Sequence, residues 1–239
     1  MIEARLAAVR ERIARAALRA GRRPEDVTLV AVSKRFPAAT VREAFEAGLR
    51  HFGENRVQEA GEKLPGLADL RTAGIVWHLV GHLQANKARK ALGLFDRIHS
   101  VDSTPLARRL SQIAAAEGMG PVRVLVQVDL GGEETKHGLS ESELLSTLET
   151  IRGLEGLRAE GLMVLPPFEE EPEQVRPYFS KLRQLRDAAL EKGLLAGDEL
   201  SMGMSHDLEV AVEEGATLVR VGTSLFGPRA PRAPAAEGA

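Results

Sequence analysis

The stretch from Thr28 to Gly53, "TLVAVSKRFPAATVREAFEAGLRHFG", contains one complete structural unit. Thr28–Ser33 is a short run of apolar and β-branched residues, which predicts a buried strand. Ala39–Ala47 has apolar residues at helical spacing, and Leu49–Gly53 predicts a second strand. A strand, a helix and a strand in this order predict parallel pairing through a helical crossover.

This unit recurs along most of the chain. The predicted strands are Thr28–Ser33, Leu49–Gly53, Ile75–Val80, Phe95–Val101, Val122–Val128, Leu157–Val164, Glu199–Met202 and Thr217–Val221. The predicted helices between them are Ala39–Ala47, Arg56–Lys63, Ala85–Leu92, Pro105–Glu117, Glu141–Ile151, Glu173–Lys192 and His206–Glu214. Eight units within 239 residues predict an α/β fold of the (β/α)8 TIM-barrel type, which typically needs about 250 residues. An open doubly wound sheet is the alternative, although no G-x-G-x-x-G turn follows the first strand.

The ends of the chain extend this pattern. Residues 2–20 predict an extra N-terminal helix that stops at Gly21, a suitable C-cap residue. No linker interrupts the strand–helix rhythm, so residues 1–227 are expected to form a single domain. Residues 228–239 are rich in Pro, Ala and Gly, and we expect them to be a disordered tail.

Composition excludes several classes of function. The net charge of -2 and the pI of about 6.3 give no electrostatic case for binding nucleic acid or an anionic membrane. The chain has no cysteine, which rules out disulfides, thiolate metal sites and thiol catalysis. The N-terminus lacks the apolar core of a secretory signal, and no segment is long and apolar enough to span a membrane. We therefore expect a cytoplasmic protein.

Small and polar residues follow the last two strands. Because the loops at the carboxyl ends of the strands form the active face of such a barrel, these residues are expected to lie together. Backbone N–H groups, hydroxyls and a helix N-terminus are suited to binding phosphate. The plainer alternative is a pair of turns with a serine N-cap. The residues concerned are Ser201, Gly203, Ser205, Gly222, Thr223 and Ser224.

Lys34 and Arg220 indicate what kind of phosphate-bearing ligand these loops could bind. Lys34 ends the first strand, so it is either a surface charge or an amine in a barrel mouth, where partial burial would favour a neutral nucleophile. An aldehyde that also carries a phosphate is pyridoxal 5'-phosphate, which binds to proteins as a lysine Schiff base. Arg220 lies in the apolar run "TLVRVG" and needs a partner. The candidates are Glu199, Asp129 or the pyridine nitrogen of such a cofactor.

Several motifs resemble a known family. They are "AVSK", "HFGENRVQE", "WHLVGHLQANK", "SVDS", "VDLGGEETKHG", "GLMVLPP" and "LSMGMSHDLEVAVEEGATLVRVGTSLFG". Together they resemble the YggS/PROSC family, the pyridoxal phosphate homeostasis proteins, over residues 27–227. That family is similar to the barrel domain of alanine racemase, of fold type III.

The resemblance implies roles for eight residues. It makes Lys34 the Schiff-base lysine and places Arg220 near the pyridine nitrogen. It puts Asn55 and His78 near the ring and its surroundings. The residues implied on or close to the phosphate are Ser201, Ser205, Gly222 and Thr223. His82 stands where many relatives have a smaller residue or proline, which puts any role for His82 in doubt.

The predicted activity is cofactor binding without catalysis. Racemases of this fold use a second base, a tyrosine from another domain, whereas the single tyrosine here, Tyr178, is expected to pack on the surface of a helix. A permanently charged Arg220 would oppose protonation of the pyridine nitrogen and weaken the ring as an electron sink. We therefore expect a pyridoxal phosphate carrier or regulator. The alternatives are a racemase-like enzyme, a class I aldolase-like enzyme acting through Lys34, and a plain binding module.

The remaining expectations concern partners and metals. Pyridoxal phosphate-requiring apo-enzymes are the expected protein partners, and the chain itself is expected to be a monomer. His78 and His82 are four residues apart but span a strand end and a loop, so no metal site is expected from them. The other histidines show no cluster of ligands in the sequence. Lys136, after the fifth strand, is either a loop charge or a second amine near the opening.

Overall fold

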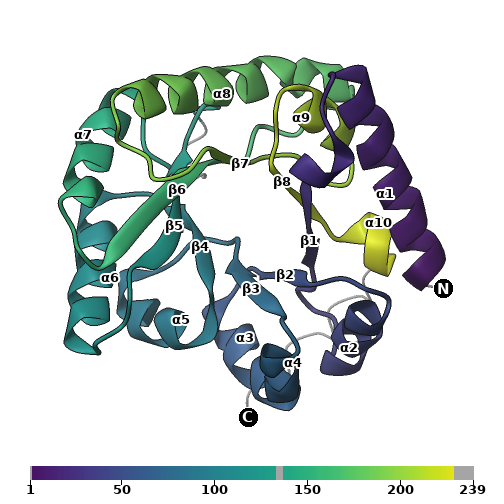
Figure 1. Ribbon diagram of the computed structural model, residues 1–239, viewed down its shortest axis with the longest axis horizontal. Helices are drawn as coiled ribbons and strands as arrows, with labels where there is room; N and C mark the ends of the chain where they lie inside the picture. Colours follow the sequence, from purple (N-terminus) through teal and green to yellow (C-terminus); the bar gives the residue numbers. More distant parts are fainter. Residues whose placement is uncertain (1, 133–136, 229–239) are drawn as a thin grey trace, which may run out of the picture.

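Eight short strands pair in parallel into a closed barrel in the computed structural model, which describes residues 2–132 and 137–228 (Figure 1). Each strand pairs with the next along the chain, and the eighth pairs with the first through Val30 and Arg220 among others. The strands are β1 (Thr28–Val32), β2 (His51–Glu54), β3 (Val76–Leu79), β4 (Arg97–Val101), β5 (Val122–Val128), β6 (Leu157–Val164), β7 (Glu199–Ser201) and β8 (Leu218–Val221). The prediction of a (β/α)8 barrel is confirmed, and the open sheet is wrong.

Helices surround the barrel (Figure 1). They are α1 (Ile2–Arg19), α2 (Ala38–Glu46), α3 (Val57–Lys63), α4 (Ala68–Thr72), α5 (Ala88–Leu94), α6 (Thr104–Ala116), α7 (Glu141–Arg152), α8 (Arg176–Glu191), α9 (Leu208–Glu213) and α10 (Thr223–Phe226). The extra N-terminal helix α1 packs against α9 and α10, and the chain leaves it through Gly21 at φ 67°. The sequence did not predict α4 or α10, because each has at most five residues and shows no helical period.

Two separate apolar cores follow from the alternation of side chains along each strand. The larger core lies between strands and helices and contains Trp77 and Phe52, whose ring centroids are 5.7 Å apart. Trp77 therefore belongs to this core between the barrel and the helices, the barrel–helix core. The smaller core fills the middle of the barrel and consists of Val30, Leu125, Met163 and Leu218. The inward face of β1 thus continues from Val30 through Val32 towards Lys34.

No helix among the residues described has the length and apolar character that crossing a membrane requires. Lys136 and, apart from Pro228, the predicted tail lie outside the described residues. Because all eight strands run in the same direction, their carboxyl ends meet at one face of the barrel. The loops at this face determine where the predicted site residues meet.

Candidate functional site

A cavity of about 530 Å³ opens at the carboxyl ends of the strands. Its volume lies within the range of small-molecule sites. Six of the eight predicted site residues line it, from loops that follow β1, β2, β7 and β8 and from β8 itself: Lys34, Asn55, Ser205, Arg220, Gly222 and Thr223. Apolar side chains including Val32, Val80, Leu165 and Met204 complete the wall. The cavity therefore combines an amine, a guanidinium and hydroxyl groups with an apolar surface that suits an aromatic ring.

Lys34 is supported from outside the barrel by a buried polar cluster. The preceding residue, Ser33, is fully buried, and its Oγ donates to Oε1 of Glu54 at 2.7 Å. Lys63 Nζ donates to the same Oε1 at 2.7 Å and to the carbonyl oxygen of Ser33 at 2.9 Å. Burial raises the pKa of Glu54, and the ammonium of Lys63 partly opposes this rise. These bonds fix the backbone at position 33, so the lysine side chain extends towards the cavity from a rigid base.

Arg220 is a buried cation with neutral partners. Its Nη1 donates to Ser201 Oγ at 2.6 Å and its Nη2 donates to the carbonyl oxygen of Val164 at 2.9 Å. Burial lowers the pKa of Arg220 to about 10, against the opposing charge of Asp207, so the guanidinium stays charged at neutral pH. An ion pair with Glu199, one of the predicted alternatives, is wrong because Glu199 pairs with Arg97 at the other end of the barrel.

The two loops predicted to bind phosphate are neighbours. The backbone N–H of Ser224 donates to Ser205 Oγ at 3.4 Å, which joins the loop after β8 to the loop after β7. From α1, Arg12 Nη2 donates to the carbonyl oxygen of Ser205 at 3.1 Å, and its guanidinium pairs with Glu209 at 2.6 Å. Thr223 begins α10, and the first N–H groups of a helix have no partner within the helix. Hydroxyls and backbone donors therefore converge on one side of the cavity.

His78 and Ser201, the other two predicted residues, do not line the cavity. Both are fully buried. Ser201 Oγ lies 2.8 Å from Nδ1 of His99, and His99 Nε2 lies 2.8 Å from Nδ1 of His78. Ser201 thus contacts Arg220 and His99 beside the cavity. His78 contacts His99 and is therefore one hydrogen bond further from the cavity. Their roles at a phosphate and a ring stay predictions.

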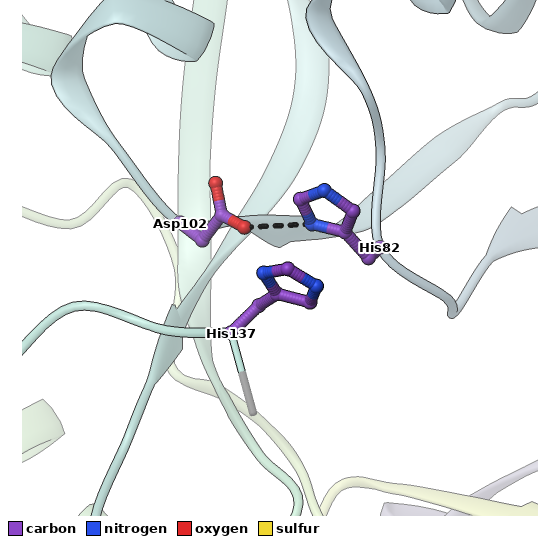
Figure 2. Close-up of side chains that lie close together, drawn as sticks. All are labelled: His82, Asp102 and His137. Carbon is purple, nitrogen blue, oxygen red and sulfur yellow. Dashed lines mark hydrogen bonds and ion pairs between the residues drawn. The ribbon is translucent and has the colours of Figure 1, made fainter. Parts of the chain in front are cut away.

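Three histidines that received no predicted role line the cavity: His82, His137 and His206. Figure 2 shows His82 beside Asp102, with the ring of His137 stacked on that of His82. Nδ1 of His82 is 2.9 Å from Oδ2 of Asp102, and the two rings have centroids 3.5 Å apart and planes within 11°. The sequence showed no grouping for His137, whereas the structure places it with His82 and Asp102. Sequence spacing concealed the cluster, because its members come from loops after three different strands.

This cluster is arranged for stacking rather than for chelation. One donor atom from each of His82, Asp102 and His137 lies within 4.8 Å of the others. A metal ion binds an imidazole nitrogen in the plane of the ring, at about 2.0–2.1 Å for zinc. The rings of His82 and His137 are nearly parallel and stacked, so no single point lies in both ring planes where one ion could bind both imidazoles. The pair instead gives the mouth of the cavity an imidazole surface that is hydrogen-bonded to a carboxylate.

Comparisons with known proteins agree with this geometry. Residues 4–230 match the family model described as "Alanine racemase, N-terminal domain". Two relatives named "Pyridoxal phosphate homeostasis protein", from Pseudomonas aeruginosa and Aquifex aeolicus, are 47% and 45% identical. The aligned regions cover 96% and 94% of this chain and 96% and 97% of those proteins. The solved structure of PipY from Synechococcus elongatus PCC7942, with PLP bound, is 43% identical with a TM-score of 0.83 and covers 95% of this chain and 100% of that one.

Proposed function

Because the chain belongs to the alanine racemase N-terminal domain family and, within it, to the YggS/PROSC family of pyridoxal phosphate homeostasis proteins, we propose that it binds pyridoxal 5'-phosphate and takes part in the homeostasis of this cofactor. The observation that carries the proposal is the meeting of Lys34, Arg220 and the two hydroxyl-bearing loops in one cavity. That donor set matches a ligand with an aldehyde, a ring nitrogen and a phosphate.

Each group in the cavity has an assignable task. When bound, pyridoxal phosphate supplies an aldehyde for a covalent bond to an amine and a ring that can accept electrons. Lys34 Nζ is the amine that would hold it. The Ser205 hydroxyl, Thr223 and the backbone at Gly222 would bind the phosphate, and Arg220 would face the ring nitrogen. Asn55 would contact the ring from the loop after β2.

We propose that the protein carries the cofactor without catalysing a reaction of amino acids. Arg220 supports this proposal because a buried cation opposes protonation of a ring nitrogen beside it, and an unprotonated ring stabilises carbanions poorly. The tyrosine that racemases use has no counterpart at the cavity, since Tyr178 lies in α8 and packs against the barrel–helix core. The histidines at the mouth are the groups that would supply a second base if turnover occurred.

Reconstitution with pyridoxal phosphate tests this function. Wild-type protein is expected to develop an absorbance band at about 420 nm that reduction with borohydride abolishes. Mass spectrometry of the reduced protein should place the adduct on the peptide containing Lys34. Lys34→Ala should show neither band nor adduct, whereas Lys181→Ala, which removes a surface lysine paired with Glu141, should behave as wild type. An adduct on another lysine would contradict the assignment of Lys34.

The proposed lack of catalysis, the protein partners and the monomeric state need separate measurements. Racemisation or transamination of an amino acid by pure protein, abolished in Lys34→Ala, would identify a racemase-like enzyme. Cleavage of a sugar phosphate without bound cofactor would identify an aldolase-like one. Delivery of the cofactor to apo-enzymes is tested by mixing loaded protein with an apo-enzyme and following its activation. Light scattering measures the molar mass in solution and so tests the expected monomeric state. The cytoplasmic location stays a prediction.

A further inference from the structure

Three histidines connect the cavity with the opposite end of the barrel. His51 is the first residue of β2, His78 lies on β3 and His99 lies on β4. Hydrogen bonds join the three rings in this order inside the barrel. His51 Nδ1 lies 3.0 Å from His78 Nε2, and His78 Nδ1 lies 2.8 Å from His99 Nε2. His99 Nδ1 then lies 2.8 Å from Ser201 Oγ. We call His51, His78, His99 and Ser201 the histidine row.

The interior members of the row are neutral. His78 and His99 are fully buried, and burial, followed by neighbouring cations and histidines, lowers the pKa of both well below the usual value. A neutral imidazole has one N–H donor and one acceptor nitrogen. Each histidine within the row uses both of its nitrogens, so it must donate in one direction along the row and accept from the other. The row therefore has only two arrangements of its hydrogens.

The hydroxyl of Ser201 selects one arrangement. Among the described residues, its hydrogen-bond partners are Arg220, which can only donate, and His99. A buried hydroxyl needs an acceptor for its hydrogen, so Ser201 donates to Nδ1 of His99. It follows that His99 Nε2–H donates to His78 and that His78 Nε2–H donates to Nδ1 of His51. All three histidines are then in the Nε2–H form.

Protonation of His51 requires the opposite arrangement. A doubly protonated imidazole must donate from Nδ1, but His78 Nε2 already presents a hydrogen to that atom. The row must therefore reverse, so that His51 donates to His78, His78 to His99 and His99 to Ser201 Oγ. Ser201 Oγ then accepts from both His99 and Arg220, and its own hydrogen needs a new acceptor. An acceptor atom of a ligand held in the cavity beside Arg220, the donor that Ser201 contacts, would provide one.

We propose that the histidine row is a two-state hydrogen-bond relay whose direction couples protonation of His51, at the amino end of the barrel, to a ligand with an acceptor atom beside Arg220, at the carboxyl end. The proposal rests on the proposed function for the identity of the ligand, pyridoxal phosphate. Coupling between two sites is reciprocal. Ligand binding should therefore make His51 easier to protonate, and protonation of His51 should strengthen ligand binding.

The residues around His51 determine how readily it is protonated in the ligand-free protein. His51 is half-buried, and burial together with the cations of Arg97 and Arg123 lowers its pKa. Those arginines are themselves paired with Glu160 and Glu199 on β6 and β7. Three further charged residues, from α1, the turn before β1 and the turn before β2, line the hollow that also contains His51: Arg10, Glu25 and Arg50. All of these groups lie outside the cavity, so the ligand does not touch them.

Nitrogen-15 NMR of histidine-labelled protein tests the relay, since imidazole nitrogen shifts separate N–H from lone-pair nitrogens. In ligand-free protein, all three row histidines should carry their hydrogen on Nε2. On saturation with pyridoxal phosphate, the proton affinity of His51 should rise roughly fivefold, the effect of one neutral hydrogen bond. In Ser201→Ala the ligand charge is kept but the link is cut, so this rise should disappear. Ser111→Ala, which removes a buried serine on α6 away from the cavity, is the matched control and should retain it.

The outcomes separate the relay from the proposed function. A missing absorbance band near about 420 nm would contradict the cofactor assignment. The ligand-free spectrum still decides the relay in that case, because an Nδ1–H on any of the three histidines overturns the arrangement. A band that forms while His51 titrates unchanged also overturns the relay, as does an equal rise in Ser201→Ala. His78→Gln, which interrupts the row at its centre, provides a second variant if Ser201→Ala does not fold.

Discussion

Lowering the pH from 7 to 5.5 should destabilise the ligand-free protein through its two fully buried histidines. His78 and His99 have folded-state pKa values well below their ordinary value of 6.5. In the unfolded chain both would take up protons as the pH falls through about 6.5. The folded state therefore binds fewer protons, so the stability that the neutral histidines contribute is present above this pH and declines below it.

The size of the effect follows from the ordinary histidine pKa of about 6.5 in the unfolded chain and from the two limits of the pH range. While the folded histidine stays neutral, each loses about 1.3 kcal/mol of stability between pH 7 and 5.5, and the pair loses about 2.5 kcal/mol. Burial raises the pKa of Glu54, Glu199 and Asp207, so protonation of these carboxyls favours the folded state as the pH falls. They oppose the loss, which makes a comparison with a histidine variant more informative than the wild-type curve alone.

Urea unfolding at half-unit pH steps measures this dependence. His78→Gln keeps a polar side chain at the site and removes one titrating group, so its loss of stability over the window should be smaller than that of wild type by about 1.3 kcal/mol. The carboxyl contributions are common to both proteins and cancel in the difference. A wild-type curve that falls no more steeply than that of His78→Gln would refute the assignment of a neutral, proton-excluding histidine at position 78.

Two further changes probe the support of the site. Lys63→Met should lower the free energy of unfolding by about 3 kcal/mol because it leaves the carboxylate of Glu54 buried, and adding Glu54→Leu should restore much of this loss in urea unfolding. No recovery would contradict the buried pair. Gly203→Ala should cost more than 1 kcal/mol and weaken cofactor binding, since its φ is 88° and a Cβ would lie 2.4 Å from that of Ala211. Gly118→Ala, with φ 63° and open space around it, is the control and should cost about 1 kcal/mol without changing cofactor binding.

Most of the barrel could be predicted from the sequence because its strands are short, apolar and regularly spaced. All eight predicted strands overlap the observed ones, with boundaries that differ by a residue or two at most ends. The helix α10 was missed because "TSLF" follows a strand directly and is too short to show a period. Two of its residues, Thr223 and Ser224, were predicted as part of a phosphate-binding loop. Thr223 lines the cavity, and Ser224 contacts Ser205 in the loop after β7.

Site residues could be predicted from the sequence where a motif follows the end of a strand. Contacts between side chains on opposite sides of the barrel could not. Lys34 and Arg220 are separated by most of the chain, yet the pairing of β1 with β8 brings their strands together. The partners of Arg220 were not evident, because the choice among Glu199, Asp129 and a ligand depends on which residue is adjacent in three dimensions. The histidine row was equally hidden, since its members come from four strands whose inward positions are known only once the register is fixed.

The neutral partners of Arg220 bear directly on what the cavity can bind. A guanidinium paired with a carboxylate would present a cancelled charge to a ligand, whereas a hydroxyl and a carbonyl oxygen leave the positive charge in place. Maintaining that charge inside the barrel costs stability, which is evident in the lowered pKa of Arg220. The carboxylates of the barrel interior, Glu160 and Glu199, are held at the amino end by other arginines. The interior is therefore polarised along its axis, because the cation at the cavity has neutral direct partners and only the more distant Asp207 opposes its charge. An anionic ligand with an acceptor atom on its ring complements that field.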